Sequence, residues 1–142
     1  MSGLRITKVF RFEGAHALMG YNGKCRHIHG HSYKLLITLT GTPSSREEDP
    51  KNGMILDFTD LKALVQKHIL DRFDHALLLR KDAPLAQELA QTYDNVCILD
   101  FQPTCEQLVC YIASILAPVL PADSLYSVRL YETPTSYAEW IR

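Results

Sequence analysis

Hydrophobic and polar residues alternate along three stretches of the chain, and such alternation is typical of β-strands that bury one face. The stretches cover residues 4–12, 32–41 and 125–132. A short hydrophobic run at 54–58 predicts a further strand, after a polar segment at 41–53 that is rich in turn residues. That segment predicts an antiparallel connection between the second strand and the third.

Two other stretches repeat hydrophobic residues at the spacing of an α-helix. The first begins after Thr59, a candidate N-cap, and extends to about residue 72. The second begins at Pro103 and ends before Pro118. Within it, Thr104 and Gln107 have the spacing of a capping box, which predicts where this helix starts.

The remaining pattern completes a single domain over residues 1–142. An insert at 80–101 contains a predicted short helix at 84–93 and a short strand at 96–99. The order of strands and helices predicts an α+β fold, with the helices on one face of an antiparallel sheet.

Composition and charge exclude several classes of protein. Of the 142 residues, 46% are hydrophobic and 22% are charged, which permits a packed core and excludes wholesale disorder. The net charge of −1 argues against a dedicated nucleic-acid-binding or membrane-surface protein, because those usually carry a basic excess. No apolar run reaches the ~20 residues of a membrane span, and the first residues do not resemble a signal peptide. We therefore expect a soluble, cytoplasmic protein.

Four of the six histidines lie between His16 and His31, together with Cys25. His29 and His31 are two residues apart at the start of a predicted strand, so both imidazoles point to the same side and can reach one ion. His16 becomes a third ligand if the first two strands are neighbours. Three histidines and an open fourth position are typical of a catalytic zinc site. If Cys25 is instead a fourth ligand, the zinc site is closed and structural.

The other residues of this window have less definite roles. His27 is either a substitute ligand or an ordinary loop histidine. Cys25 lies between Lys24 and Arg26, and nearby cations favour the thiolate form, which can act as a base or nucleophile. The remaining cysteines lie in hydrophobic segments or at a helix start, so we expect them to be buried; they are Cys97, Cys105 and Cys110.

Two further acidic positions could take part in chemistry. Asp74 and His75 follow the first helix and could form a proton relay, or could simply end that helix. Glu132 continues the core-facing row of Val128 and Leu130, so its carboxylate either lies at the rim of the sheet or binds a ligand.

Six elements occur in order along the chain, and together they resemble the family of 6-pyruvoyl-tetrahydropterin synthase and its bacterial relative 6-carboxy-tetrahydropterin synthase. They are the runs FRFEGAH at 10–16, CRHIHGH at 25–31, GMILDF at 53–58, DH at 74–75, PTCE at 103–106 and YET at 131–133. The resemblance covers nearly the whole chain. The sequence departs from the family pattern at Gly14, His27 and Leu79, and in the long insert.

The resemblance implies a tunnelling fold, with a four-stranded antiparallel sheet, two helices on one face, and subunits that close a barrel as a homohexamer. It implies zinc held by His16, His29 and His31, and a thiol base at Cys25. It also implies an Asp74–His75 relay and a site shared between subunits. The pterin ring would be held by Glu132 and by backbone contacts of the Thr104 segment.

The implied reaction converts 7,8-dihydroneopterin triphosphate to 6-carboxy-tetrahydropterin, with release of triphosphate and acetaldehyde, in queuosine precursor synthesis. We expect this product because the chain is short and lacks an N-terminal extension. Three alternatives stay open: the pyruvoyl product of biopterin synthesis, a neopterin aldolase-like enzyme, and a non-catalytic ring protein stabilised by zinc. Cys25 argues against the second alternative, and Cys25 with Asp74–His75 argues against the third.

Overall fold

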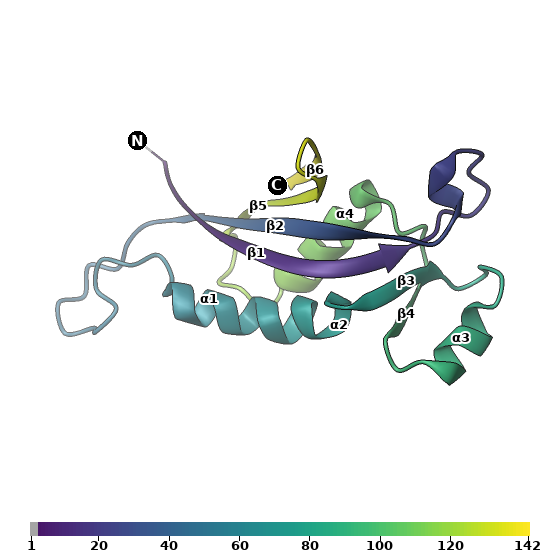
Figure 1. The fold of residues 1–142 in the computed structure, drawn as a ribbon. Coiled ribbons are helices and arrows are strands. Elements are labelled where there is room, and N and C mark those ends of the chain that lie inside the picture. Colours follow the sequence, from purple (N-terminus) through teal and green to yellow (C-terminus); the bar gives the residue numbers. More distant parts are fainter. Residues whose placement is uncertain (1–2) are drawn as a thin grey trace.

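The computed structural model describes residues 3–142, except for the side chain of Cys25, and contains one six-stranded sheet with helices packed against it (Figure 1). The strands are β1 (Leu4–His16), β2 (His29–Gly41), β3 (Ala76–Arg80), β4 (Val96–Leu99), β5 (Leu125–Thr133) and β6 (Ser136–Ile141). Their order across the sheet is β4-β3-β1-β2-β5-β6. β3 is parallel to both β1 and β4, and the other neighbours are antiparallel, so the sheet is mixed.

Two helical segments cover one face of the sheet. The first is continuous and consists of α1 (Phe58–Val65), the π-helical turn η2 (Gln66–Leu70) and α2 (Asp71–Phe73). The second is α4 (Cys105–Leu116), and two short elements, η1 (Lys24–Arg26) and α3 (Ala86–Thr92), lie in connections. Within residues 3–142, no helix combines the length and the apolar character that crossing a bilayer requires.

The core lies between this face of the sheet and the two helical segments. Alternate residues of β1 and β2 are buried, including Phe10, Phe12, Tyr33 and Leu35. The same parity places His16 on the buried face, at the end of β1. The face predicted from hydrophobic alternation is therefore the face on which the histidines lie.

The α+β class is confirmed, but the prediction of a four-stranded antiparallel sheet is wrong. β3 was not predicted as a strand because its hydrophobic residues are consecutive and mostly buried, as is usual for a parallel strand inside a sheet. β6 was missed because it is an edge strand with several exposed residues and no clear alternation.

Residues 54–58 do not form the predicted strand. Asp57 is the N-cap of α1, because its side chain accepts a hydrogen bond from the backbone N–H of Thr59 at 2.8 Å. The helix therefore begins at Phe58, and Thr59 is not the cap. The N-cap predicted for the second helix is confirmed, since the Thr104 hydroxyl accepts from the N–H of Gln107.

Of the three cysteines expected in the core, Cys97 and Cys105 are buried, whereas Cys110 is exposed on α4. The burial of Cys110 was predicted wrongly because this residue follows the buried Val109 directly and therefore points away from the core side of the helix.

Candidate metal centre and its surroundings

Three histidines from neighbouring strands converge at one end of the sheet. His16 ends β1 and is paired with His29 at the start of β2, while His31 lies two residues further along the same face. The Nε2 atom of His16 lies 3.0 Å from Nε2 of His29 and 3.2 Å from Nε2 of His31. The ligand atoms of all three rings lie within 4.8 Å of one another, so they could hold one metal ion.

Backbone carbonyl groups orient two of these rings. Nδ1 of His16 donates to the carbonyl oxygen of Pro103, and Nδ1 of His29 donates to that of His27, each at 2.7 Å. Because a carbonyl oxygen only accepts, Nδ1 of each ring carries a proton, and in the neutral form of the ring Nε2 is left as an acceptor. Two acceptors 3.0 Å apart repel each other unless a cation lies between them.

The spacing of the nitrogen atoms fits a small tetrahedral ion. Ligands at ~2.0–2.1 Å from a tetrahedral zinc are about 3.3 Å apart. This is close to the distances of 3.0 and 3.2 Å from Nε2 of His16 to Nε2 of His29 and of His31. Burial lowers the pKa of His16 and of His31 below its usual value, which keeps both rings neutral and able to coordinate a metal.

Glu132 reaches the same cluster from β5. One carboxylate oxygen lies 3.3 Å from Nε2 of His31, and about a quarter of the Glu132 side chain is exposed. Glu132 therefore sits at the boundary between the histidines and a pocket of ≈ 450 Å³, which Thr104, Cys105 and Glu106 also line. This pocket is large enough to admit the ring system of a small ligand.

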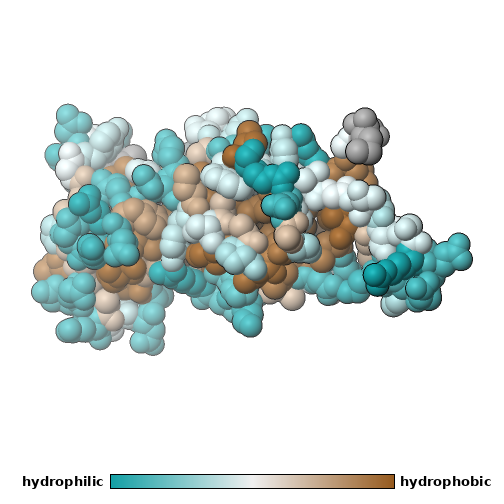
Figure 2. All heavy atoms as spheres, turned by 180° about the vertical axis from the view of Figure 1, so that it is seen from behind, coloured by the Kyte–Doolittle hydropathy of each residue, from teal (hydrophilic) through white to brown (hydrophobic). Residues whose placement is uncertain are grey.

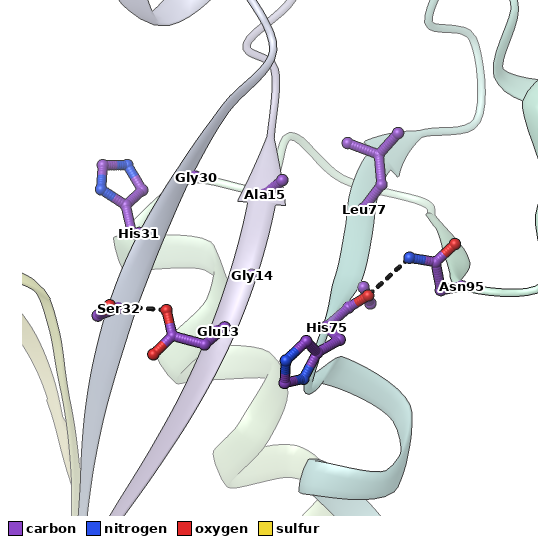
Figure 3. Close-up of a pocket in the computed structure, with 10 residues that line it drawn as sticks. Glu13, Gly14, Ala15, Gly30, His31, Ser32, His75, Leu77 and Asn95 are labelled. Atoms are coloured by element: carbon purple, nitrogen blue, oxygen red, sulfur yellow. Dashed lines mark hydrogen bonds between the residues drawn. The ribbon is translucent and has the colours of Figure 1, made fainter.

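Asp74 and His75 lie elsewhere. Nδ1 of His75 is 2.9 Å from Oδ1 of Asp74, and that oxygen also accepts from the backbone N–H of Glu13 at 3.0 Å. The side chain of Glu13 is on the face opposite to His16, because the two residues differ in parity along β1. Figure 3 shows His75 beside Glu13, in a pocket of ≈ 440 Å³ that His31 also lines.

Comparison with known proteins decides the family. Residues 5–141 match the family model of 6-pyruvoyl tetrahydropterin synthase. The chain belongs to this family. It is 36% identical over 140 residues to the 6-carboxy-5,6,7,8-tetrahydropterin synthase of Haemophilus influenzae. This match covers 96% of this chain and 97% of that relative. It is 34% identical over 113 residues to the human 6-pyruvoyl tetrahydrobiopterin synthase, with coverage of 78% and 66%.

Solved structures agree with this assignment at the level of the fold. An uncharacterized protein of Wolinella succinogenes superposes with a TM-score of 0.81 at 22% identity, over 100% of this chain and 99% of the other. The 6-pyruvoyl tetrahydropterin synthase of Caenorhabditis elegans gives a TM-score of 0.71 at 25% identity, over 100% and 97%. The predicted resemblance is confirmed, as is the prediction that the chain is an enzyme of this family.

The structure of this pterin synthase family member brings together only some of the residues predicted to form its site. His16, His29, His31 and Glu132 form one cluster, and Thr104 lines the pocket beside it. The backbone of Cys25 lies in the η1 turn between β1 and β2, while its side chain is outside the described residues. Asp74 and His75 form a pair of their own, and His75 lines a pocket with Glu13 and Ser32, whose side chains lie on the opposite face of the sheet.

Three residues beside these groups were not predicted from the sequence. Both polar atoms of the Gln102 carboxamide bind the backbone of Met19, with Oε1 accepting at 3.0 Å and Nε2 donating at 2.7 Å. The hydroxyl of Tyr33 is buried and has no hydrogen-bond partner among the described residues. The side chain of Asn95 donates to the carbonyl of His75. The contacts of Gln102 and Asn95 carry no local sequence signal, since each joins distant segments of the chain.

Proposed function

We propose that this chain is a zinc-dependent 6-carboxy-5,6,7,8-tetrahydropterin synthase. It would convert 7,8-dihydroneopterin triphosphate to 6-carboxy-tetrahydropterin, releasing triphosphate and acetaldehyde, as a step in queuosine precursor synthesis. The observation that carries the proposal is the convergence of three histidine Nε2 atoms beside Glu132, in a chain similar over 96% of its length to a relative of that name.

The donor set supports zinc as the metal. His16, His29 and His31 would hold it, beside the carboxylate of Glu132. When bound, zinc would supply a Lewis acid for the hydroxyl groups of the substrate's side chain and increase the acidity of the neighbouring carbon.

Glu132 and Thr104 are suited to hold the flat end of the substrate. A carboxylate has two acceptor oxygens, which match the adjacent N–H and NH₂ groups on the edge of a pterin ring. A ring bound in the pocket that both residues line would lie near the histidines, because the Glu132 carboxylate is 3.3 Å from Nε2 of His31. Binding there would fix the distance between the side chain of the substrate and the metal ligands.

Cys25 would act as the base that removes a proton from the substrate's side chain. The Asp74–His75 pair would move protons on the other side of the substrate's side chain. Asp74 holds Nδ1 of His75, so Nε2 is the atom that could accept or release a proton.

These groups support a site shared between subunits. Within one chain, His75 lies on the face opposite the histidine cluster, whereas the η1 turn with Cys25 lies beyond the ends of β1 and β2 (Figure 1). A neighbouring chain could supply the missing relay. Figure 2 shows hydrophobic residues reaching the surface along the middle of the molecule. The large hydrophobic residues exposed in this chain include Leu4, Val9, Tyr137 and Ile141. Both features support the proposed homohexamer, with subunits forming a barrel.

The alternative function differs from the proposed one in its product. A 6-pyruvoyl product could arise in a similar site, and the human relative of that name matches this chain over 113 residues. The similarity to the 6-carboxy enzyme of Haemophilus influenzae extends over 97% of that relative, compared with 66% for the human 6-pyruvoyl relative and 83% for that of Poecilia reticulata. This difference in coverage favours the carboxy product.

Incubation of the zinc-loaded protein with 7,8-dihydroneopterin triphosphate should yield 6-carboxy-tetrahydropterin and acetaldehyde. Mass spectrometry of the pterin and an aldehyde-trapping assay measure both products. A 6-pyruvoyl pterin without acetaldehyde would assign the chain to the alternative activity. Intact substrate after incubation with fully zinc-loaded protein would contradict both enzymatic functions.

Replacing Glu132 with glutamine should weaken substrate binding while the zinc content stays the same. Glutamine keeps the shape of the side chain but exchanges one acceptor oxygen for a donor, which would oppose a pterin N–H. We expect a loss of roughly 1.5–3 kcal/mol in binding free energy, the value of a hydrogen bond to a charged group. Steady-state kinetics and elemental analysis test this. An unchanged Michaelis constant together with unchanged turnover would show that Glu132 does not hold the pterin ring.

A further inference from the structure

His75 has an unusual backbone conformation. Its φ angle is +61°, in the left-handed region that residues other than glycine rarely adopt. A conformation of this kind persists only where the surrounding contacts impose it, and it is concentrated at functional sites. Contacts of the surrounding residues must therefore hold the backbone of His75 in this conformation.

Both backbone polar groups of His75 are bound by distant segments. Its N–H donates to the carbonyl of Glu13 in β1 at 2.6 Å. Its carbonyl accepts from Nδ2 of Asn95 at 2.7 Å, as Figure 3 shows. Asn95 also accepts, through its own backbone carbonyl, from the N–H of Leu77 at 2.8 Å.

The position of Asn95 explains why a side chain makes this contact. Asn95 immediately precedes β4, which is paired with β3 from Leu77 onward. His75 lies before β3 and has left the extended conformation, so the ladder of backbone hydrogen bonds cannot continue to it. The Asn95 carboxamide extends the ladder by one step and satisfies the His75 carbonyl.

The imidazole of His75 has few contacts with the rest of the protein. Its side chain is 77% exposed, and the contact with Asp74 at 2.9 Å is its one ion pair among the described residues. Without a packed surrounding, the direction of the ring depends on the backbone of His75 and on Asp74. The backbone in turn depends on Glu13 and Asn95.

We propose that Asn95 is a positioning residue for His75, holding its backbone so that the imidazole is presented in a fixed direction. The catalytic part of this proposal rests on the proposed function, in which His75 moves protons. The positional part concerns the hydrogen bond from Asn95 and does not depend on the reaction.

Hydrogen–deuterium exchange of Asn95→Ala tests the positional part. The amide of His75 should exchange faster by about 2-fold to about 10-fold, the range that corresponds to the net value of one hydrogen bond. The control is Asp94→Ala, which truncates the exposed neighbouring side chain; within residues 3–142 that side chain has no hydrogen bond or ion pair, and exchange should be unchanged. Unchanged exchange at His75 in Asn95→Ala would overturn the proposal, whether or not the protein is active.

Kinetics test the catalytic part. Asn95→Ala should lower kcat by about 2-fold to about 10-fold without changing KM or zinc content. In a His75→Gln background, the same substitution should have no further effect on kcat, because its action passes through His75. An equal loss of kcat in both backgrounds would show a general structural effect and would overturn the positioning role. If His75→Gln has no measurable turnover, the exchange result decides.

Discussion

Replacing His16 with alanine should abolish stoichiometric zinc binding and destabilise the protein. His16 is the central member of the cluster, because its Nε2 lies within 3.2 Å of both other Nε2 atoms, and its side chain is 1% exposed. A bound ion at a thousand times its dissociation constant contributes about 4.1 kcal/mol to the free energy of unfolding, and the variant would lose this contribution. Elemental analysis and thermal unfolding with and without a chelator measure the two effects.

His27→Ala is the matched control. The structure uses the backbone carbonyl of His27, which accepts from Nδ1 of His29, and this carbonyl remains when the side chain is removed. The His27 side chain is exposed. The variant should therefore keep its zinc. A full complement of zinc in His16→Ala, or none in His27→Ala, would reject the assignment of ligands.

Cys25→Ala should lose most of its turnover while it keeps zinc, fold and assembly. If the thiolate acts as a general base, its removal should lower kcat by about 10²–10⁴-fold. Zinc content separates this role from coordination, because removal of a fourth ligand would weaken zinc binding, whereas removal of a base would leave the three histidine ligands in place. Loss of zinc together with activity would favour the closed structural site.

Mixing two inactive variants tests whether the site is shared. Cys25→Ala lacks the proposed base, and His75→Gln lacks the proposed relay, so each homo-oligomer should be nearly inactive. Mixed oligomers formed after dissociation and reassociation would contain some sites with an intact Cys25 from one chain and an intact His75 from another. Recovery of activity is the expected result, whereas no recovery in verified mixed oligomers would place both groups in one chain.

The convergence of the three histidines could be predicted from the sequence because it depends on parity and on one strand pairing. His29 and His31 share a face by the two-residue repeat of a strand, and the pairing of β1 with β2 brings His16 opposite His29. Both facts follow from neighbouring segments of the chain. The same holds for the cap at Thr104, since its partner Gln107 is three residues away.

The remaining features depend on contacts that local patterns do not encode. The insertion of β3 beside β1 joins segments about 60 residues apart, and it determines that His75 lies on the face opposite His16. Asn95 acts on His75 across another long connection. The strand predicted at 54–58 failed for a different reason: Asp57 ends the extended segment by capping a helix, and a hydrophobic run alone does not distinguish the two structures.

The π-helical turn η2 has a consequence for differences in length between homologues. Phe73 follows Leu61 by twelve positions, which in a regular α-helix would place it about 120° around the axis from Leu61. The turn accommodates one additional residue and reduces this angle to about 20°, so that both side chains are buried. A homologue with one residue fewer between these positions can therefore keep the same buried stripe, and the same approach to Asp74, with an uninterrupted α-helix. A deletion of this kind is expected to be neutral inside η2, and disruptive between Leu61 and Val65, because it would change the four-residue spacing that places both on the buried side of α1.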